Sequence, residues 1–134
     1  LKHYLDSIFT LMWKYRFFYA NLPEILQRDE VLHNEYIGVQ EKLQTNLVDI
    51  MRAFVSLGLV AVDEKEMKPL VRTLHLIASS WLGYQAAMSP KTKITEQVIH
   101  QGMLQMVSVL KPKATPQGFE QLQLFEDGVK AIHT

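Results

Sequence analysis

The stretch "MWKYRFFYANLPEILQRDE" (Met12–Glu30) carries five aromatic rings within seven residues and an arginine, Arg16, among them. At 100° per residue the rings spread around much of the helix that we expect over residues 1–20. So wide an apolar sector indicates packing against more than one neighbour. The segment Asn21-Leu22-Pro23 is predicted to end that helix, and Pro23 to open a short turn over residues 23–28, because proline has no amide hydrogen and disfavours helical angles before it.

Arg16 falls inside the apolar sector of this first helix. A buried charge needs a partner, since an isolated one costs several kcal/mol. One interpretation is a salt bridge with an acid of the following turn, for which the candidates are Glu24, Asp29 and Glu30. The other is a polar anchor that receives a carboxylate ligand. The salt bridge is the preferred interpretation, and both stay open.

The rest of the chain predicts an all-α fold, a helical bundle of about five helices in one domain (1–134), with no strand. Amphipathic spacing predicts helices over residues 30–57, 64–88 and 95–110, and a short last helix from about Phe119 to Ile132. The apolar stripe of the longest one is Leu32, Tyr36, Val39, Leu43, Leu47, Ile50, Phe54 and Leu57. Gly58 is predicted to end that helix and Asp63 to cap the next.

Composition excludes several classes of protein. Lys plus Arg and Asp plus Glu both number 14, which argues against a self-sufficient nucleic-acid binder. The absence of cysteine excludes disulfides and thiolate metal sites and fits a cytoplasmic location. Residues 73–90 carry no charged side chain, but they are interrupted by polar residues and are marginal for a membrane span, so a buried helix of a soluble protein is expected there.

Catalytic and metal-binding patterns are weak. The five histidines never fall at the i, i+4 spacing of a helical metal pair, and no glycine-rich phosphate loop is present. We therefore expect no enzyme, no cofactor and no metal. His75 and His100 lie beside apolar faces, where a hydrogen-bonded packing role is preferred over a ligand contact.

The aromatic segment, "W-x-Y-R-F-F-Y-x-x-L-P" over residues 13–23, is followed by the step Arg28-Asp29 and by "LGLVAVDEKEMKPLVRTLHLIASSWLGY" over residues 57–84. With these features the chain resembles the C-terminal part of TetR-type bacterial transcriptional repressors over about residues 8–110. The resemblance implies an all-helical domain that forms a homodimer and usually holds a small-molecule effector. In such proteins an N-terminal helix-turn-helix domain binds operator DNA as a dimer. Nothing in this chain matches that reading domain, so we expect contact with DNA only through a domain absent from this chain.

The resemblance also implies where the sites lie. Its last two long helices usually form a four-helix bundle with those of the partner, which points here to Leu76, Ser80, Gly83, Ala87, Ile99, Met103, Met106 and Val107. The small side chains of the helix over 64–88 give a physical reason, because they permit close approach of another helix. The ligand pocket is expected between the first three long helices, at Trp13, Arg16, Phe17, Met51, Phe54, Leu74 and Trp81.

The function expected from this resemblance is an effector-sensing and dimerisation domain of a repressor, in which binding of a small molecule is coupled to DNA release. The alternative is a helical interaction or dimerisation module without a small-molecule ligand, whose aromatic residues form only the core.

Overall fold

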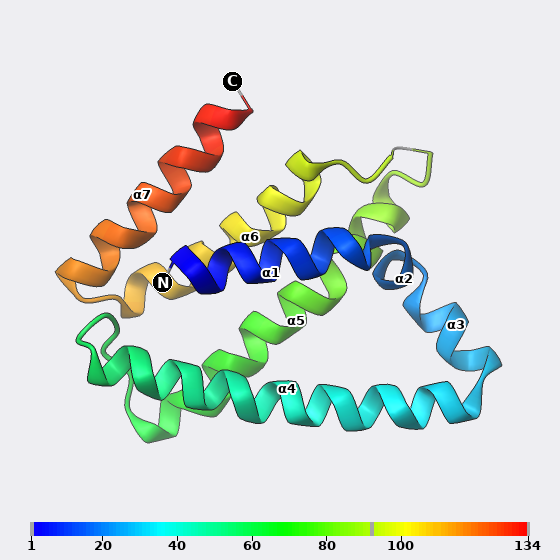
Figure 1. Cartoon of the computed structure of the whole chain (residues 1–134), viewed down its shortest axis with the longest axis horizontal. Helices are drawn as coiled ribbons and strands as arrows, with labels where there is room; N and C mark the ends of the chain where they lie inside the picture. Colours follow the sequence, from blue (N-terminus) through cyan, green and yellow to red (C-terminus); the bar gives the residue numbers. More distant parts are fainter. Residues whose placement is uncertain (1, 92, 134) are drawn as a thin grey trace.

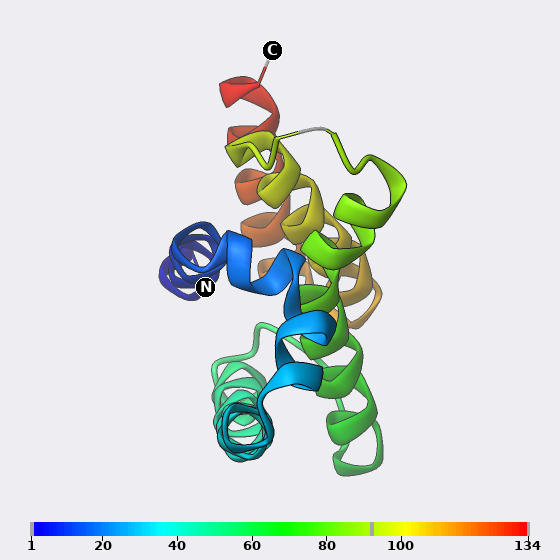
Figure 2. The same cartoon turned by 90° about the vertical axis from the view of Figure 1, so that its right-hand side faces the viewer.

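The structure, a computed structural model, describes residues 2–91 and 93–133. The fold is all-α, as predicted. In the described residues, one isolated antiparallel β-bridge pairs Val60 with Ala114. The helices in chain order are α1 (Lys2–Lys14), α2 (Arg16–Ala20), α3 (Leu22–Arg28), α4 (Glu30–Ser56), α5 (Glu64–Met88), α6 (Glu96–Leu110), the 3-10 turn η1 (Lys111–Lys113) and α7 (Pro116–Ile132). α1 and α4 form one side of the molecule, and α5 passes behind them (Figure 1, Figure 2). None of the described helices is long and apolar enough to cross a membrane.

The prediction of one helix over residues 1–20 is wrong, because the helix is interrupted at Tyr15, between α1 and α2. The break frees the carbonyl of Trp13, which accepts a hydrogen bond of 2.6 Å from Nη1 of Arg16. At the end of α2, Nδ2 of Asn21 donates to the carbonyl of Phe17 at 2.8 Å. Side chains thus replace the amide donors that an unbroken helix would supply, and α2 turns away from the axis of α1 to pack on α5.

The turn predicted over residues 23–28 is instead the seven-residue helix α3. The capping signals predicted at Asp29, Gly58 and Asp63 are confirmed. Asp29 accepts from the amide of Leu32 at 3.0 Å and begins α4, and Asp63 accepts from the amide of Glu66 at 2.9 Å and begins α5. Gly58 has a φ of +73°, the left-handed conformation expected at the end of a helix. The last helix was predicted to be short, but α7 has 17 residues and is longer than α6, which has 15.

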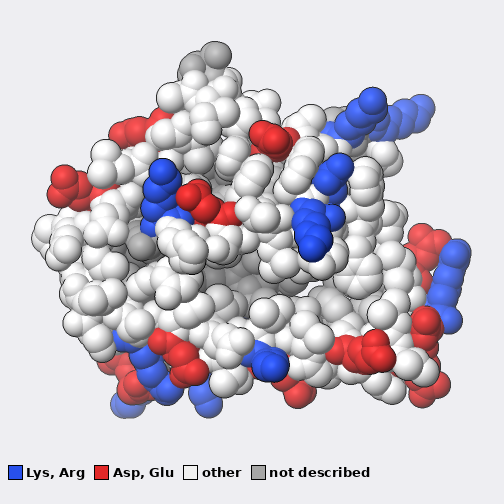
Figure 3. All heavy atoms as spheres, in the orientation of Figure 1, with Lys and Arg blue, Asp and Glu red and all other residues white. Residues whose placement is uncertain are grey.

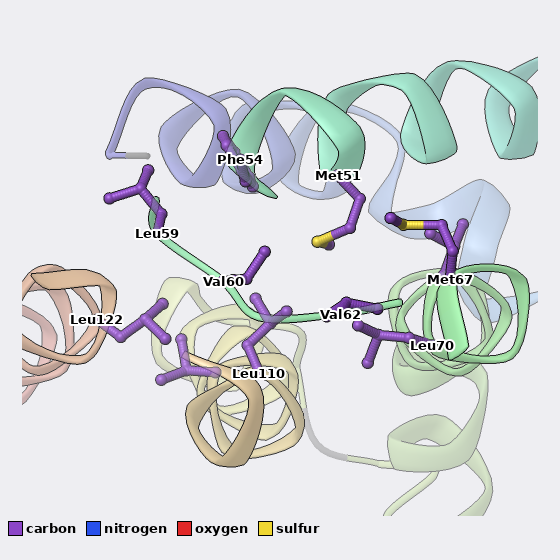
Figure 4. Close-up of a cluster of buried hydrophobic side chains, with 11 residues drawn as sticks. Met51, Phe54, Leu59, Val60, Val62, Met67, Leu70, Leu110 and Leu122 are labelled. Atoms are coloured by element: carbon purple, nitrogen blue, oxygen red, sulfur yellow. The ribbon is translucent and has the colours of Figure 1, made fainter. Parts of the chain in front are cut away.

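Two apolar clusters hold the helices together. The first gathers where the connection from α4 to α5 crosses between the helices, so that Val60 and Val62 meet Leu110 of α6 and Leu122 of α7 (Figure 4). The second joins α1, α5 and α6 through Leu5, Met12, Leu82, Ile99, Met103 and Met106. The long helix α4 contributes Met51 and Phe54 to the first cluster from its C-terminal half, while its N-terminal half is more exposed.

The α4–α5 and α6–α7 connections are joined by backbone hydrogen bonds. The amide of Ala61 donates to the carbonyl of Lys113 at 2.7 Å, and the amide of Thr115 donates to that of Leu59 at 3.0 Å. Gly118 sits directly against this junction, since a Cβ atom there would lie 1.8 Å from the carbonyl oxygen of Leu59. The position therefore requires glycine, and it fixes how α7 leaves the junction.

Candidate functional site

A cavity of about 270 Å³ lies between the two sides of the molecule. Its walls come from α1, α4 and α5, with α6 behind them and Tyr19 of α2 at the side. The surface between α1 and α4 is hollowed in Figure 3. The walls are mostly aliphatic, from Leu5, Ile8, Leu43, Leu47, Ile50 and Leu74. Such an apolar enclosure with a few polar groups is typical of a small-molecule site.

The main polar group in the wall is His75, near the middle of α5. Its Nε2 lies 2.5 Å from Oε1 of Gln40, and its Nδ1 lies 3.3 Å from Nε2 of Gln44. Both contacts are satisfied at once by the neutral ring that carries its proton on Nε2, because Nε2 then donates to Gln40 and Nδ1 accepts from Gln44. Burial lowers the pKa of His75 below its ordinary value, which favours this neutral form.

Tyr19 is a second polar group in the wall. Burial raises the pKa of its phenol above the ordinary value, with smaller contributions from Tyr36 and Tyr15. The hydroxyl is therefore neutral at physiological pH and can donate or accept a hydrogen bond. Among the described residues, no Asp, Glu, Lys or Arg lines the cavity.

The seven residues predicted for a ligand pocket do not all meet in this cavity. Met51, Phe54 and Leu74 line it. Trp13, Phe17 and Trp81, like Arg16, lie outside its wall, and 66% of Phe17 is exposed.

Trp81 faces α6 instead of the cavity. Its indole Nε1 donates to the carbonyl of Val98 at 2.8 Å. The ring lies directly over Gly102, where a Cβ atom would come within 2.5 Å of Cδ1 of the indole. Trp81 therefore packs α5 against α6.

Arg16 does not form the salt bridge that the sequence favoured. Its guanidinium carbon lies 3.9 Å from the ring centre of Trp13 and 4.7 Å from that of Phe17. Of the predicted acids, Glu24 pairs with Arg28 at 2.6 Å and Asp29 caps α4. Within the described part of the chain, no ion pair includes Arg16. Two aromatic faces and the carbonyl of Trp13 surround the charge in place of a carboxylate.

The residues predicted for the pocket did not include Tyr19, Gln40 or His75, although His75 was expected to be hydrogen-bonded and is. A signal for Gln40 was available, because positions 36, 40, 43, 47, 50 and 54 share helical spacing and Gln40 is the polar member of that register. The predicted stripe used Val39 instead, and 55% of Val39 is exposed. A polar side chain within an apolar register is therefore the feature that marks this wall.

The residues predicted for a dimer interface differ in their exposure. Leu76, Ser80 and Ala87 of α5 are exposed, with 56% of Leu76 accessible. Gly83 is half-buried near the carbonyl of Tyr19. The four on α6 are buried within the protomer itself, namely Ile99, Met103, Met106 and Val107. Beyond Glu96 in its first turn, the exposed residues of α6 are uncharged, namely Gln97, Gln101, Gln105 and Ser108.

Comparison with known proteins agrees with this architecture. A TetR family model, described as a bacterial transcriptional repressor, matches residues 1–122. A TetR-family transcriptional regulator from Marinobacter aquaeolei VT8 has a similar fold, with a TM-score of 0.77 and 20% sequence identity over 94% of this chain. The chain spans 60% of the length of that regulator. Among curated proteins, none matches the chain. The family model covers most of the sequence, and the chain therefore belongs to the TetR family of bacterial transcriptional repressors.

Proposed function

We propose that this chain is the effector-sensing and dimerisation part of a transcriptional repressor. The observation that carries the proposal is the apolar cavity of about 270 Å³, which is lined by five helices, opens between α1 and α4, and is bordered by a few neutral polar groups. A concave, mostly apolar pocket with a few polar groups is the usual form of a small-molecule site, so this cavity favours a binding role over pure packing.

The position of α1 supports a coupling between the cavity and DNA. Leu5, Ile8 and Met12 of this helix form part of the wall, while Tyr4 packs against Phe54 of α4 with 5.3 Å between ring centres. We expect a ligand that binds between α1 and α4 to shift how these two helices lie against each other. A helix-turn-helix domain joined ahead of α1 would move with it, which would alter the separation of the two reading heads in a dimer.

A thermal-shift screen tests the sensing role against the alternative of an interaction module without a ligand. A compound that binds only the folded chain stabilises it by RT ln(1 + [L]/Kd), which is about 2.7 kcal/mol at one hundred times Kd. We expect at least one small neutral apolar compound to raise the melting temperature in a concentration-dependent way. A broad library in which no compound raises it would favour the interaction module.

For dimerisation, we propose the outward surfaces of the α5–α6–α7 part of the molecule. α5 presents Leu76, Ser80 and Ala87, and α7 presents the exposed side chains of Leu124 and Ile132. The buried residues predicted on α6 would support this surface from behind. Because α7 has 17 residues, it is long enough to pack against a helix of a partner, as α5 is.

Charge substitutions on each helix separate these contributions. Leu76→Glu on α5 and Leu124→Glu on α7 place a carboxylate on the two outward surfaces, and Val39→Glu on α4 is the control at an equally exposed apolar residue. We expect the wild type and Val39→Glu to sediment as dimers, and at least one of the other variants to dissociate. A monomeric wild type at micromolar concentration would refute the dimer.

A further inference from the structure

The polarity of the cavity changes along α4. This helix contributes wall residues from Gln40 to Phe54, a distance of about 21 Å at 1.5 Å per residue. His75 bonds to Gln40 at one end, and Tyr4 covers Phe54 at the other. Between these ends the wall that α4 presents is aliphatic. The lining therefore extends along α4, with Gln40 and His75 at one end and the rings of Phe54 and Tyr4 at the other.

The polar end offers neutral hydrogen-bond donors. Because Oε1 of Gln40 accepts from His75, the amide N–H groups of Gln40 remain to donate. The hydroxyl of Tyr19 adds a second donor. Tyr19 follows Phe18, whose ring centre lies 6.5 Å from that of Tyr36, one helical turn before Gln40. The hydroxyls of Ser7 and Ser79, which also belong to the wall, already donate to backbone carbonyls of their own helices. The complementary ligand group is thus an acceptor, a carbonyl or a hydroxyl oxygen.

The wall provides no charge to pair with an ionised ligand. In the described residues it contains no Asp, Glu, Lys or Arg, and His75 is neutral in its bonds to Gln40 and Gln44. An ionised group moved from water into such an enclosure loses its hydration without gaining a counter-charge. Arg16, the cation nearest in sequence to Tyr19, is held against Trp13 and is not in the wall.

The volume of the cavity limits the size of the ligand. An apolar protein cavity of about 150 Å³ holds one benzene molecule, and this cavity has about 270 Å³. We propose that the cavity takes a neutral, elongated amphiphile of about ten carbon atoms, with its apolar body toward Phe54 and one carbonyl or hydroxyl group at Gln40 and Tyr19. This inference rests on the proposed sensing function and adds the chemical class of the effector.

Two probes with the same chain length but different head groups test the class. 1-Decanol and decanoate are titrated into the 134-residue chain at pH 8, where decanoate is ionised, below the concentration at which either aggregates. We expect 1-decanol to bind with a Kd about tenfold or more below that of decanoate, since burying the unpaired carboxylate is costly. Decanoate that binds as tightly as 1-decanol would overturn the neutral class but would leave the sensing function intact. If neither probe binds, the amphiphile class is wrong, and the library screen alone then decides the sensing function.

Substitutions locate the head group. Gln40→Leu removes the proposed donor, and Asn46→Leu makes the same change of chemistry at an exposed residue of the same helix. We expect Gln40→Leu to raise the Kd of 1-decanol about tenfold, which is the effect of losing one hydrogen bond. Asn46→Leu should leave this Kd unchanged. Tyr19→Phe, which removes a single hydroxyl, keeps the test valid if Gln40→Leu unfolds the chain, and its expected loss is about fivefold. If both Tyr19→Phe and a folded Gln40→Leu bind 1-decanol with the wild-type affinity, the head group does not lie at the Gln40 end of the cavity.

Discussion

Replacement of Gly118 by alanine tests the junction that holds α7 in place. A Cβ atom at this position would lie 1.8 Å from the carbonyl oxygen of Leu59, whereas real contacts stay beyond 3.0 Å, so the two segments must separate by about 1.2 Å. The obstacle is backbone on both sides, and a rotamer change cannot remove it. Gly118→Ala therefore forces α7 away from the α4–α5 connection.

The magnitude follows from the hydrogen bonds that this movement breaks. Thr115 donates from its amide to Leu59 at 3.0 Å and from its hydroxyl to Gly58 at 2.6 Å. Ala61 donates to Lys113 at 2.7 Å. Three hydrogen bonds at about 1 kcal/mol each predict a loss of about 3 kcal/mol in the free energy of unfolding.

Gly128→Ala provides the matched control in the same helix. A Cβ atom at Gly128 meets nothing within 4 Å, and alanine is favoured over glycine within a helix by about 1 kcal/mol. In urea unfolding followed by circular dichroism at 222 nm, the free energies of unfolding of the two variants should thus differ by about 4 kcal/mol, with the wild type between them. A Gly118→Ala variant as stable as the wild type would refute the close contact.

Three further perturbations address other parts of the structure. Arg16→Ala removes the contact with the ring and carbonyl of Trp13 and should lower the free energy of unfolding by about 1 to 2 kcal/mol in urea titrations, whereas an unchanged value would mean that the guanidinium is solvated. Gly102→Ala places a methyl group 2.5 Å from the indole of Trp81 and should cost about 1 to 3 kcal/mol with a shift in tryptophan emission, and an unshifted spectrum would contradict the packing. Burial, followed by a neighbouring histidine, lowers the pKa of His100, so the unfolded chain binds more protons than the folded one and stability should fall as pH drops below about 6.5. His100→Gln should reduce the dependence of the free energy of unfolding on pH, measured by chemical denaturation between pH 7 and pH 5. An unchanged dependence would mean that other groups cause it.

Local chemistry explains why most helix boundaries were predictable. Asp29, Asp63 and Gly58 act within three residues of the boundary that each sets, through a capping side chain or a left-handed backbone. The break at Tyr15 has no such signal, because neither proline nor glycine stands there. It is supported by packing of α2 on α5 and by the side-chain bond from Arg16, which depend on the tertiary structure.

The cavity was less predictable than the fold. Helical spacing places Met51, Phe54 and Leu74 on inward sides, and they do line the cavity. It also places Trp13 and Trp81 inward, but both belong to the cluster between α1, α5 and α6. A helical wheel gives the direction of a side chain and not the neighbour that it meets, so it cannot separate a cavity wall from a packed core.

The cavity as a ligand site is tested most directly by filling it. Leu43 lines the cavity and lies outside both buried clusters, so Leu43→Trp occupies the space with little effect on the core, and Asn46→Trp adds the same ring at an exposed position of α4. The compound with the largest thermal shift is titrated by calorimetry against the three proteins. We expect the wild type and Asn46→Trp to bind one molecule per chain with equal affinity and Leu43→Trp to bind at least about tenfold more weakly, a loss of about 1.4 kcal/mol. Equal affinity in all three proteins would place the ligand elsewhere and contradict the sensing cavity.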